Sequence, residues 1–151
     1  MGKALLEVFL ISMAPVAELR GGIPYGLAQG LPAFPVFLVA LVGNILPVPF
    51  LILFLRYLLR RGSHFSLLSS FLRWQESRLG RRFRRYGEWA LIPLVAVPLP
   101  GTGAWTGALA AALLGIPLRR ALPLISLGVV VAGVLVLFLG LGARAILQGP
   151  G

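Results

Sequence analysis

The chain contains no cysteine and only one histidine, His64. The absence of cysteine excludes disulfides, thiolate metal sites and redox motifs. A single histidine in a serine-rich turn cannot by itself build a histidine-based metal centre. The sequence also lacks a Ser-His-Asp set and a phosphate-loop motif. We therefore expect no metal, no cofactor and no enzymatic activity.

Charged residues are scarce as well. They make up 12% of the 151 residues, whereas soluble domains carry about 25%. Apolar residues make up 58%, and the mean hydropathy is +0.94. A chain with so little charge could not cover the surface of a soluble domain. We therefore expect one membrane domain spanning residues 1–151, with membrane lipids as its main surroundings.

The charge that is present is mostly basic and concentrated in one segment. The net charge is +10, and nine of the fourteen basic residues lie between Arg56 and Arg85. Basic loops favour the cytoplasmic side of a membrane. We therefore expect a multi-pass protein of the inner (cytoplasmic) membrane, with residues 56–86 in the cytoplasm and no nucleic-acid partner. Apolar residues at helical spacings predict a basic amphipathic helix on the membrane surface over residues 61–87. They are Phe65, Leu68, Leu72, Leu79, Phe83 and Tyr86.

Two segments are long enough to cross a bilayer as helices, which takes about 20 residues. They are Ala33–Leu59 and Ala121–Ile146. The first contains Asn44, which could hydrogen-bond across helices. It also contains two prolines, Pro47 and Pro49, where we expect a kink.

Two further apolar segments are too short to cross. Ala4–Ala14 is followed by a proline- and glycine-rich stretch at residues 15–24, and Trp89–Val97 by a similar stretch at residues 98–103. A short apolar run then resumes in each case. This pattern is typical of re-entrant hairpins, whose irregular backbone must be buried in protein or line a cavity. A second hairpin would also place Arg119-Arg120 on the same side as the main basic segment.

The chain carries an internal repeat, which appears when the sequence is aligned with itself so that Pro15 meets Pro100. The five identities that mark the repeat are all glycine or proline, the residues that shape the backbone. The further matched pairs are Gly22 with Gly107, Gly30 with Gly115, Pro32 with Pro117, and Gly43 with Gly128. We call this fixed spacing between the halves the repeat offset.

The repeat predicts two halves of opposite orientation, residues 4–60 and 88–147. The predicted fold is therefore an all-α integral membrane protein. It is an inverted repeat of two re-entrant helical hairpins, each followed by a transmembrane helix, with the basic amphipathic segment between them.

Glu18 is the strongest candidate for a working residue. It is one of four acids in the chain, and it lies in the first hairpin tip two residues before Arg20. Ionisable residues at membrane depth are costly and often functional. Burial favours the neutral carboxyl group and a neighbouring arginine favours the charged one, so Glu18 could bind and release protons. Arg20 could hold a phosphate or carboxylate, or it could only pair with Glu18 to close the loop.

The second hairpin tip has no charge, so its chemistry would come from its backbone. Gly101 and Gly103 let consecutive N–H groups point at one spot, and the helix that follows adds a partial positive charge. Thr102 and Thr106 add hydroxyl groups, and Trp105 adds an aromatic wall. These features suit an anionic group, although a tight turn with close helix packing would show the same residues.

The two tips, PVAELRGGIP at residues 15–24 and PLPGTGAWTG at residues 98–107, resemble the two characteristic segments of the small multidrug export protein family. The resemblance extends over residues 4–147. That family is similar to the DedA (VTT-domain) membrane proteins, which implies re-entrant hairpins and lipid translocation. DedA proteins tend to carry arginines around the Pro-Gly of the second hairpin. Here Val97 and Gly103 occupy those positions, so Arg20 would have to supply the positive charge.

These features predict a membrane transporter or lipid flippase in which Glu18 couples transport to protons. The substrate would be an anionic lipid phosphate or a small amphiphile, held by Arg20 and the residues of the second tip. Two alternatives remain open: export of cationic drugs with Glu18 as counter-ion, and a non-transporting membrane scaffold acting through the arginine-rich helix. Because so few helices can hardly surround a polar cavity, a homodimer is a further expectation.

Overall fold

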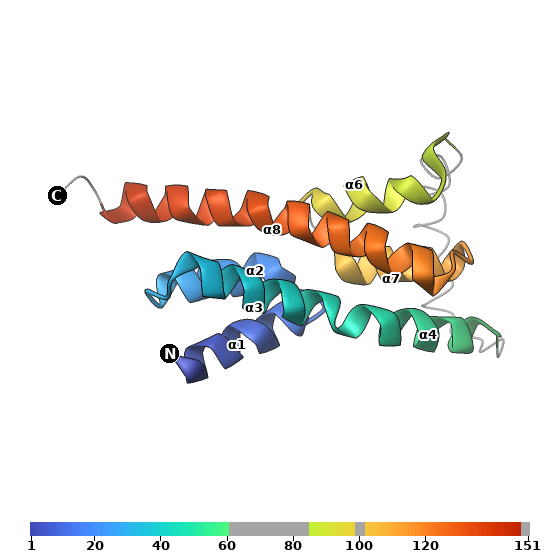
Figure 1. Ribbon diagram of the computed structural model, residues 1–151, viewed down its shortest axis with the longest axis horizontal. Coiled ribbons are helices and arrows are strands. Elements are labelled where there is room, and N and C mark those ends of the chain that lie inside the picture. The colour runs from blue at the N-terminus through green and yellow to red at the C-terminus, as the bar shows by residue number, and fades with distance from the viewer. Residues whose placement is uncertain (61–84, 99–101, 149–151) are drawn as a thin grey trace.

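The computed structural model describes residues 1–60, 85–98 and 102–148, and every regular element in these ranges is a helix. Figure 1 shows their arrangement. The first part of the chain contains α1 (Gly2–Met13), α2 (Glu18–Ala28), α3 (Ala33–Ile45) and α4 (Pro47–Arg60). The second contains the 3-10 helix η1 (Gly87–Ala90), α6 (Leu91–Ala96), α7 (Ala104–Leu113) and α8 (Leu118–Gln148). The predicted amphipathic helix over residues 61–87 lies largely outside the described residues.

Two stretches of helix are long and apolar enough to cross a membrane, as predicted. They are Ala33–Arg60, which comprises α3 and α4, and Leu118–Ile146 within α8. The first breaks at Leu46, directly before the two predicted kink prolines, because a proline lacks the N–H that would continue the helix. Their length and apolar composition fit helices that span a membrane.

The two short apolar segments of each half form helices that fold back on each other. α1 packs on α2, and α6 packs on α7. α1, at 12 residues, has a length of about 18 Å, well below the ~30 Å thickness of the hydrocarbon core. In Figure 1 the first pair begins at the end of the molecule where α1 starts and α8 ends, and the second pair begins at the opposite end.

The expected break over residues 15–24 was wrong for most of its length. α2 begins at Glu18 and includes Gly21, Gly22 and Pro24. The glycines are tolerated in this helix because α1 approaches it closely. A Cβ atom on Gly22 would lie 3.0 Å from the carbonyl oxygen of Val8 and still closer to the Ser12 hydroxyl. Tertiary packing therefore offsets the low helix propensity of glycine.

The helix boundaries of the two halves correspond at the repeat offset. The clearest case is the turn after each hairpin, where Gly30 and Gly115 have φ angles of 75° and 66°. An equivalent backbone hydrogen bond closes each turn. Leu31 N–H donates to the Gly26 carbonyl at 3.1 Å, and Ile116 N–H donates to the Ala111 carbonyl at 3.0 Å. This is the left-handed glycine ending that commonly terminates helices.

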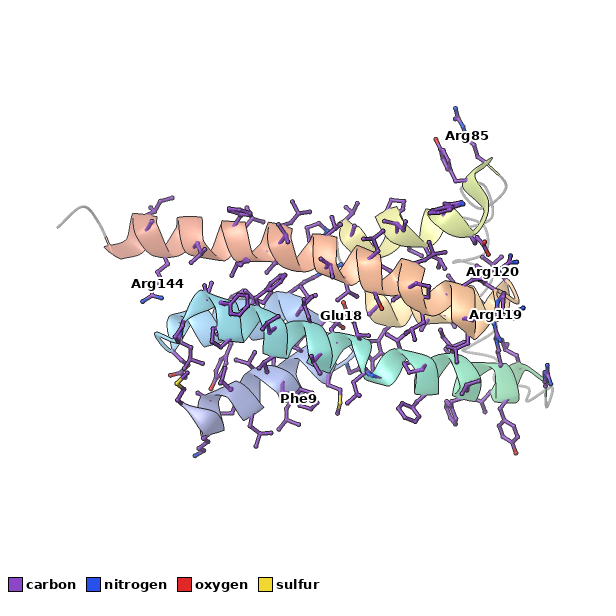
Figure 2. The ribbon with its side chains drawn as sticks, viewed as in Figure 1. Phe9, Glu18, Arg85, Arg119, Arg120 and Arg144 are labelled. Atoms are coloured by element: carbon purple, nitrogen blue, oxygen red, sulfur yellow. The ribbon has the colours of Figure 1, made fainter. Side chains whose placement is uncertain are left out.

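Each half also packs against the span of the other. α2 lies on α8, and α7 lies on α4. The two spans run lengthwise in opposite directions (Figure 1). The two hairpin tips therefore meet between the spans, and Figure 2 shows Glu18 near the middle of the long axis.

The surface and the interior are distributed as expected for a protein surrounded by lipid. Large apolar side chains on the spans are exposed, among them Phe34, Phe50 and Phe138. The core contains many small residues, including the alanines of α7. In the described ranges only three polar or charged side chains are buried: Ser12, Glu18 and Asn44.

Most of the described basic residues lie at one end of the molecule. Figure 2 shows Arg119 and Arg120 at the end that also holds Arg85, with Arg144 at the other end. Arg120 forms an ion pair with Glu88 at 3.5 Å, which ties η1 to the start of α8. The second helix pair thus returns to the end of the molecule at which it started.

Candidate functional site

The two hairpin tips meet at a buried carboxylate. Glu18, at the start of α2, is 4% exposed, and its side chain points at the N-terminus of α7. The backbone N–H of Trp105 donates to Glu18 Oε1 at 3.3 Å. The N–H of Ala104 and the side chain of Asn44 also hydrogen-bond this carboxylate. The first turn of a helix carries unpaired N–H groups and a partial positive charge, which stabilise an anion.

The backbone at Glu18 is strained. Its φ angle is 50°, and it is the only non-glycine residue with positive φ in the described ranges. Such conformations cost of the order of 1–3 kcal/mol for a non-glycine residue and cluster at functional sites. The conformation lets the chain turn into α2 while the carboxylate faces the other tip.

Arg20 crosses from the first tip to the second. One guanidinium nitrogen, Nη2, donates to the hydroxyl of Thr102 at 2.9 Å and to the backbone carbonyl of Val97 at 3.1 Å. The Thr102 hydroxyl donates to the same carbonyl at 2.6 Å. Arg20 also acts electrostatically on Glu18. It therefore does more than pair with Glu18 within one loop, because it joins the two tips.

Gly103 permits the close approach of the two tips. Its φ angle is 135°, and a Cβ atom built on it would lie 2.5 Å from Glu18 Oε1 and closer still to Oε2. Any side chain at this position would therefore displace the carboxylate from α7. The glycine permits a close backbone approach, and the acidic side chain that approaches it in this structure is the chain's own Glu18.

The other predicted site residues fall into three groups. Asn44 is buried on α3 and contacts Glu18. Trp105 and Thr106 lie half-buried in the first turn of α7, with Trp105 also contributing its backbone N–H. Gly101 lies outside the described residues.

Sequence reasoning missed two contributors to this region. Val97 participates through its carbonyl oxygen, so its side chain gave no signal. Ser12 is fully buried on α1 and packs against Gly22 and Gly43. Ser12 is a polar residue in an apolar stretch of helix, and this pattern, which singled out Asn44, could also have indicated Ser12.

Among the buried polar atoms around the tips, Ser12 Oγ, Asn44 Oδ1 and Trp105 Nε1 have no hydrogen-bond partner in the described part of the chain. Buried polar groups are nearly always paired, and exceptions call for a ligand, a water molecule or a functional explanation. The tips therefore retain capacity to bind a polar group beyond the contacts that they make with each other.

The sequence also matches a known protein family. A family model described as "Putative small multi-drug export protein" matches residues 18–135. The chain belongs to this family. The matched range begins at Glu18 and includes most of the first tip, all of the second tip, α3, α4 and more than half of α8. No curated protein and no solved structure matches the chain.

Proposed function

We propose that this member of the small multidrug export family is a transporter, not an enzyme, that moves an anionic lipid phosphate or a related small amphiphile across the membrane. One observation supports it most strongly: the buried Glu18 carboxylate occupies the N-terminus of α7 where the two tips meet. A carboxyl group in such a place is a proton-binding group within reach of an anion-binding site.

The arrangement in the membrane that we propose is an inverted repeat. Both helix pairs would enter the bilayer partway, from opposite sides, and meet at mid-depth. The matching helix boundaries of the two halves and the opposite directions of the spans support this arrangement. The end with Arg56, Arg60, Arg119 and Arg120 would face the cytoplasm from the inner membrane. Inverted repeats with broken helices at the midplane are a transporter architecture.

Glu18 would act as an internal anion that competes with the substrate. When ionised, it uses the N–H groups of Ala104 and Trp105 that an anion would otherwise take. Protonation removes its charge and weakens those hydrogen bonds, since charge-assisted hydrogen bonds are about twice as strong as neutral ones. A substrate phosphate could then bind the α7 N-terminus and Arg20. Proton uptake and anion binding would thereby be linked.

Export of cationic drugs is the alternative, and the description of the family favours it. A cation would use Glu18 as its counter-ion. It would have to compete with Arg20 and the helix N-terminus, both of which already stabilise the carboxylate. The site therefore favours the anion on electrostatic grounds. A homodimer is also part of the proposal, because each chain offers few helices to enclose a polar path.

The test uses purified protein in liposomes under an imposed pH gradient. Movement of a fluorescent phosphatidic acid and of ethidium is compared for wild type, Glu18→Gln and Glu88→Gln. Glu88 is the matched control, because it pairs with Arg120 at the end of the molecule. We expect wild type and Glu88→Gln to move the anionic lipid and Glu18→Gln to lose most of that movement.

The other outcomes are equally informative. Proton-dependent movement of ethidium alone, lost in Glu18→Gln, would establish the cationic alternative. Equal transport by wild type and Glu18→Gln would overturn the role of Glu18. The scaffold hypothesis predicts no transport by any of the three proteins, with function residing in the arginine-rich segment outside the described residues.

A further inference from the structure

A second basic site lies away from the hairpin tips, at the end of the molecule that carries most of the described arginines. It is a pocket of about 410 Å³ between the last turns of α4 and α7. None of the six described residues that line it is acidic. They are Arg56, Leu59, Arg60, Ala112, Leu113 and Gly115.

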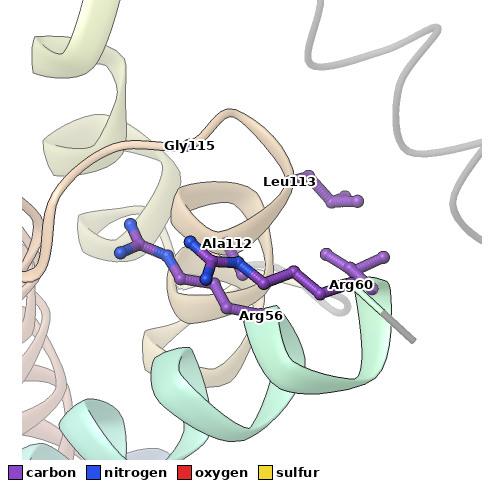
Figure 3. Close-up of a pocket in the computed structure, with 6 residues that line it drawn as sticks. Arg56, Arg60, Ala112, Leu113 and Gly115 are labelled. Atoms are coloured by element: carbon purple, nitrogen blue, oxygen red, sulfur yellow. The ribbon is translucent and has the colours of Figure 1, made fainter. Parts of the chain in front are cut away.

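The two arginines lie one helical turn apart on α4, and Figure 3 shows both guanidinium groups extended toward the turn that carries Gly115. Arg56 is half-buried, and its Nη2 donates to the backbone carbonyl of Ile116. This hydrogen bond fixes the Arg56 side chain against the end of α7. Arg60 is exposed at the mouth of the pocket.

A related pocket at the opposite end of the molecule provides an internal comparison. Its volume is about 360 Å³. At the repeat offset, its lining residues Leu27, Ala28 and Gly30 correspond to Ala112, Leu113 and Gly115 of the first pocket. The charge differs: the second pocket has one arginine, Arg144, whereas the first has two. The two arginines therefore belong to one pocket only, and the internal repeat does not account for them.

We propose that the pocket at Arg56 and Arg60 binds a phosphate group, with these two arginines as its ligands. Two guanidinium groups on one helix face, with no acidic residue among the described lining residues, create a positive potential that a bound anion relieves. Guanidinium groups bind phosphate through paired, charge-assisted hydrogen bonds. Leu59 and Leu113 add an apolar wall that suits the glycerol and upper acyl chain of an anionic lipid. The inference rests on residues outside the Glu18 site and stands independently of the proposed transport.

The positive-inside rule would also place arginines at this end of the molecule. The experiment must therefore distinguish arginines that bind phosphate from arginines that only set the membrane orientation. Arg119 is exposed at the same end but does not line the pocket, which makes it the matched control. The full-length protein in an uncharged detergent is titrated with a short-chain phosphatidic acid, and separately with the corresponding phosphatidylcholine. The variants are Arg60→Gln, Arg119→Gln, Glu18→Gln and the double variant of Arg60→Gln with Glu18→Gln.

We expect wild type to bind the phosphatidic acid and Arg60→Gln to bind it about tenfold more weakly, since hydrogen bonds to charged groups contribute roughly 1.5–3 kcal/mol. Arg119→Gln should bind like wild type. The loss caused by Arg60→Gln should be the same in the Glu18→Gln background, which separates this site from the one at the tips. Because Arg60 is exposed, its substitution should leave the fold intact, and a melting curve for the variant checks this.

Competition with inorganic phosphate distinguishes the sources of the phosphate. Displacement of the lipid shows that the phosphate group alone is recognised, and failure of displacement assigns the pocket to a lipid headgroup. Equal affinity for the two lipids, or equal losses in Arg60→Gln and Arg119→Gln, would overturn the proposal. Either result would leave the arginines as a topological signal only.

Discussion

Glu18 and Gly103 occupy equivalent positions in the two halves of the chain, and they touch each other. Both have positive φ angles, 50° and 135°. The glutamate side chain fills the space that a side chain at the glycine would need. Only one of the two equivalent positions can therefore carry a side chain. The asymmetry puts a single carboxylate between the two tips, and it makes this contact the first place to test.

Substitution of Gly103 by alanine should displace the Glu18 carboxylate from α7. The added Cβ would overlap the carboxylate, and a non-glycine residue at this φ would add strain of about 1–3 kcal/mol. We expect a lower melting temperature in detergent and loss of any Glu18-dependent transport.

The control is Gly142→Ala on α8, where an added Cβ meets nothing within 4 Å. This change should be neutral or slightly stabilising, because alanine is the better helix former. Combining Gly103→Ala with Glu18→Ala removes the overlapping atoms and should restore part of the stability. If the double variant is no more stable than Gly103→Ala alone, the contact is not the cause.

The bridge between Arg20 and Thr102 should appear as a coupling energy between the two tips. Arg20→Ala and Thr102→Val each remove one partner of the 2.9 Å hydrogen bond. A double-mutant cycle measured by chemical unfolding in mild detergent should give a coupling of about 0.5–3 kcal/mol.

Thr102→Ser is the matched control for this cycle, since it keeps the hydroxyl that accepts from Arg20 and donates to Val97. It should retain most of the coupling. Strictly additive effects of Arg20→Ala and Thr102→Val would show that the two tips are not linked through this pair.

The glycines Gly43 and Gly128 should respond alike, because they stand at equivalent positions where a span approaches a short helix. A Cβ on Gly43 would lie 2.7 Å from the carbonyl oxygen of Phe9, and one on Gly128 would lie 3.0 Å from that of Ile92. A backbone atom cannot move aside as a flexible side chain can. Alanine at either position should therefore destabilise the fold by about 1–3 kcal/mol.

The melting temperature in detergent measures this effect, with Gly2→Ala as the control, because a Cβ at Gly2 meets nothing within 4 Å. Gly43→Ala and Gly128→Ala are both expected to lower the melting temperature relative to wild type, by similar amounts. A loss for one variant and none for the other would mean that the two halves are not packed in the same way.

The sequence was sufficient to locate features that depend on local chemistry. The two spans follow from runs of apolar residues, and the break at Leu46 follows from the prolines after it. The turns at Gly30 and Gly115 follow from the glycine and proline matches of the internal repeat. Each depends on a few neighbouring residues, so composition and spacing alone predict it.

The sequence also singled out Glu18 and Arg20, because charges in an apolar chain are rare and costly. It could not show what they contact. Arg20 reaches Val97 and Thr102 in the other half of the chain, and Glu18 binds the N–H of Trp105 there. Such contacts depend on how the two helix pairs pack against each other, and no local sequence pattern predicts that packing.

What the sequence determined by itself is a small, basic membrane protein with two apolar spans and two glycine- and proline-rich tips. Only the tertiary structure decided that α2 continues through Gly21, Gly22 and Pro24, and that the acidic side chain at the α7 N-terminus is Glu18. The physical reason is the same in both cases. Close packing against another helix stabilises a conformation that the local residues would not favour alone.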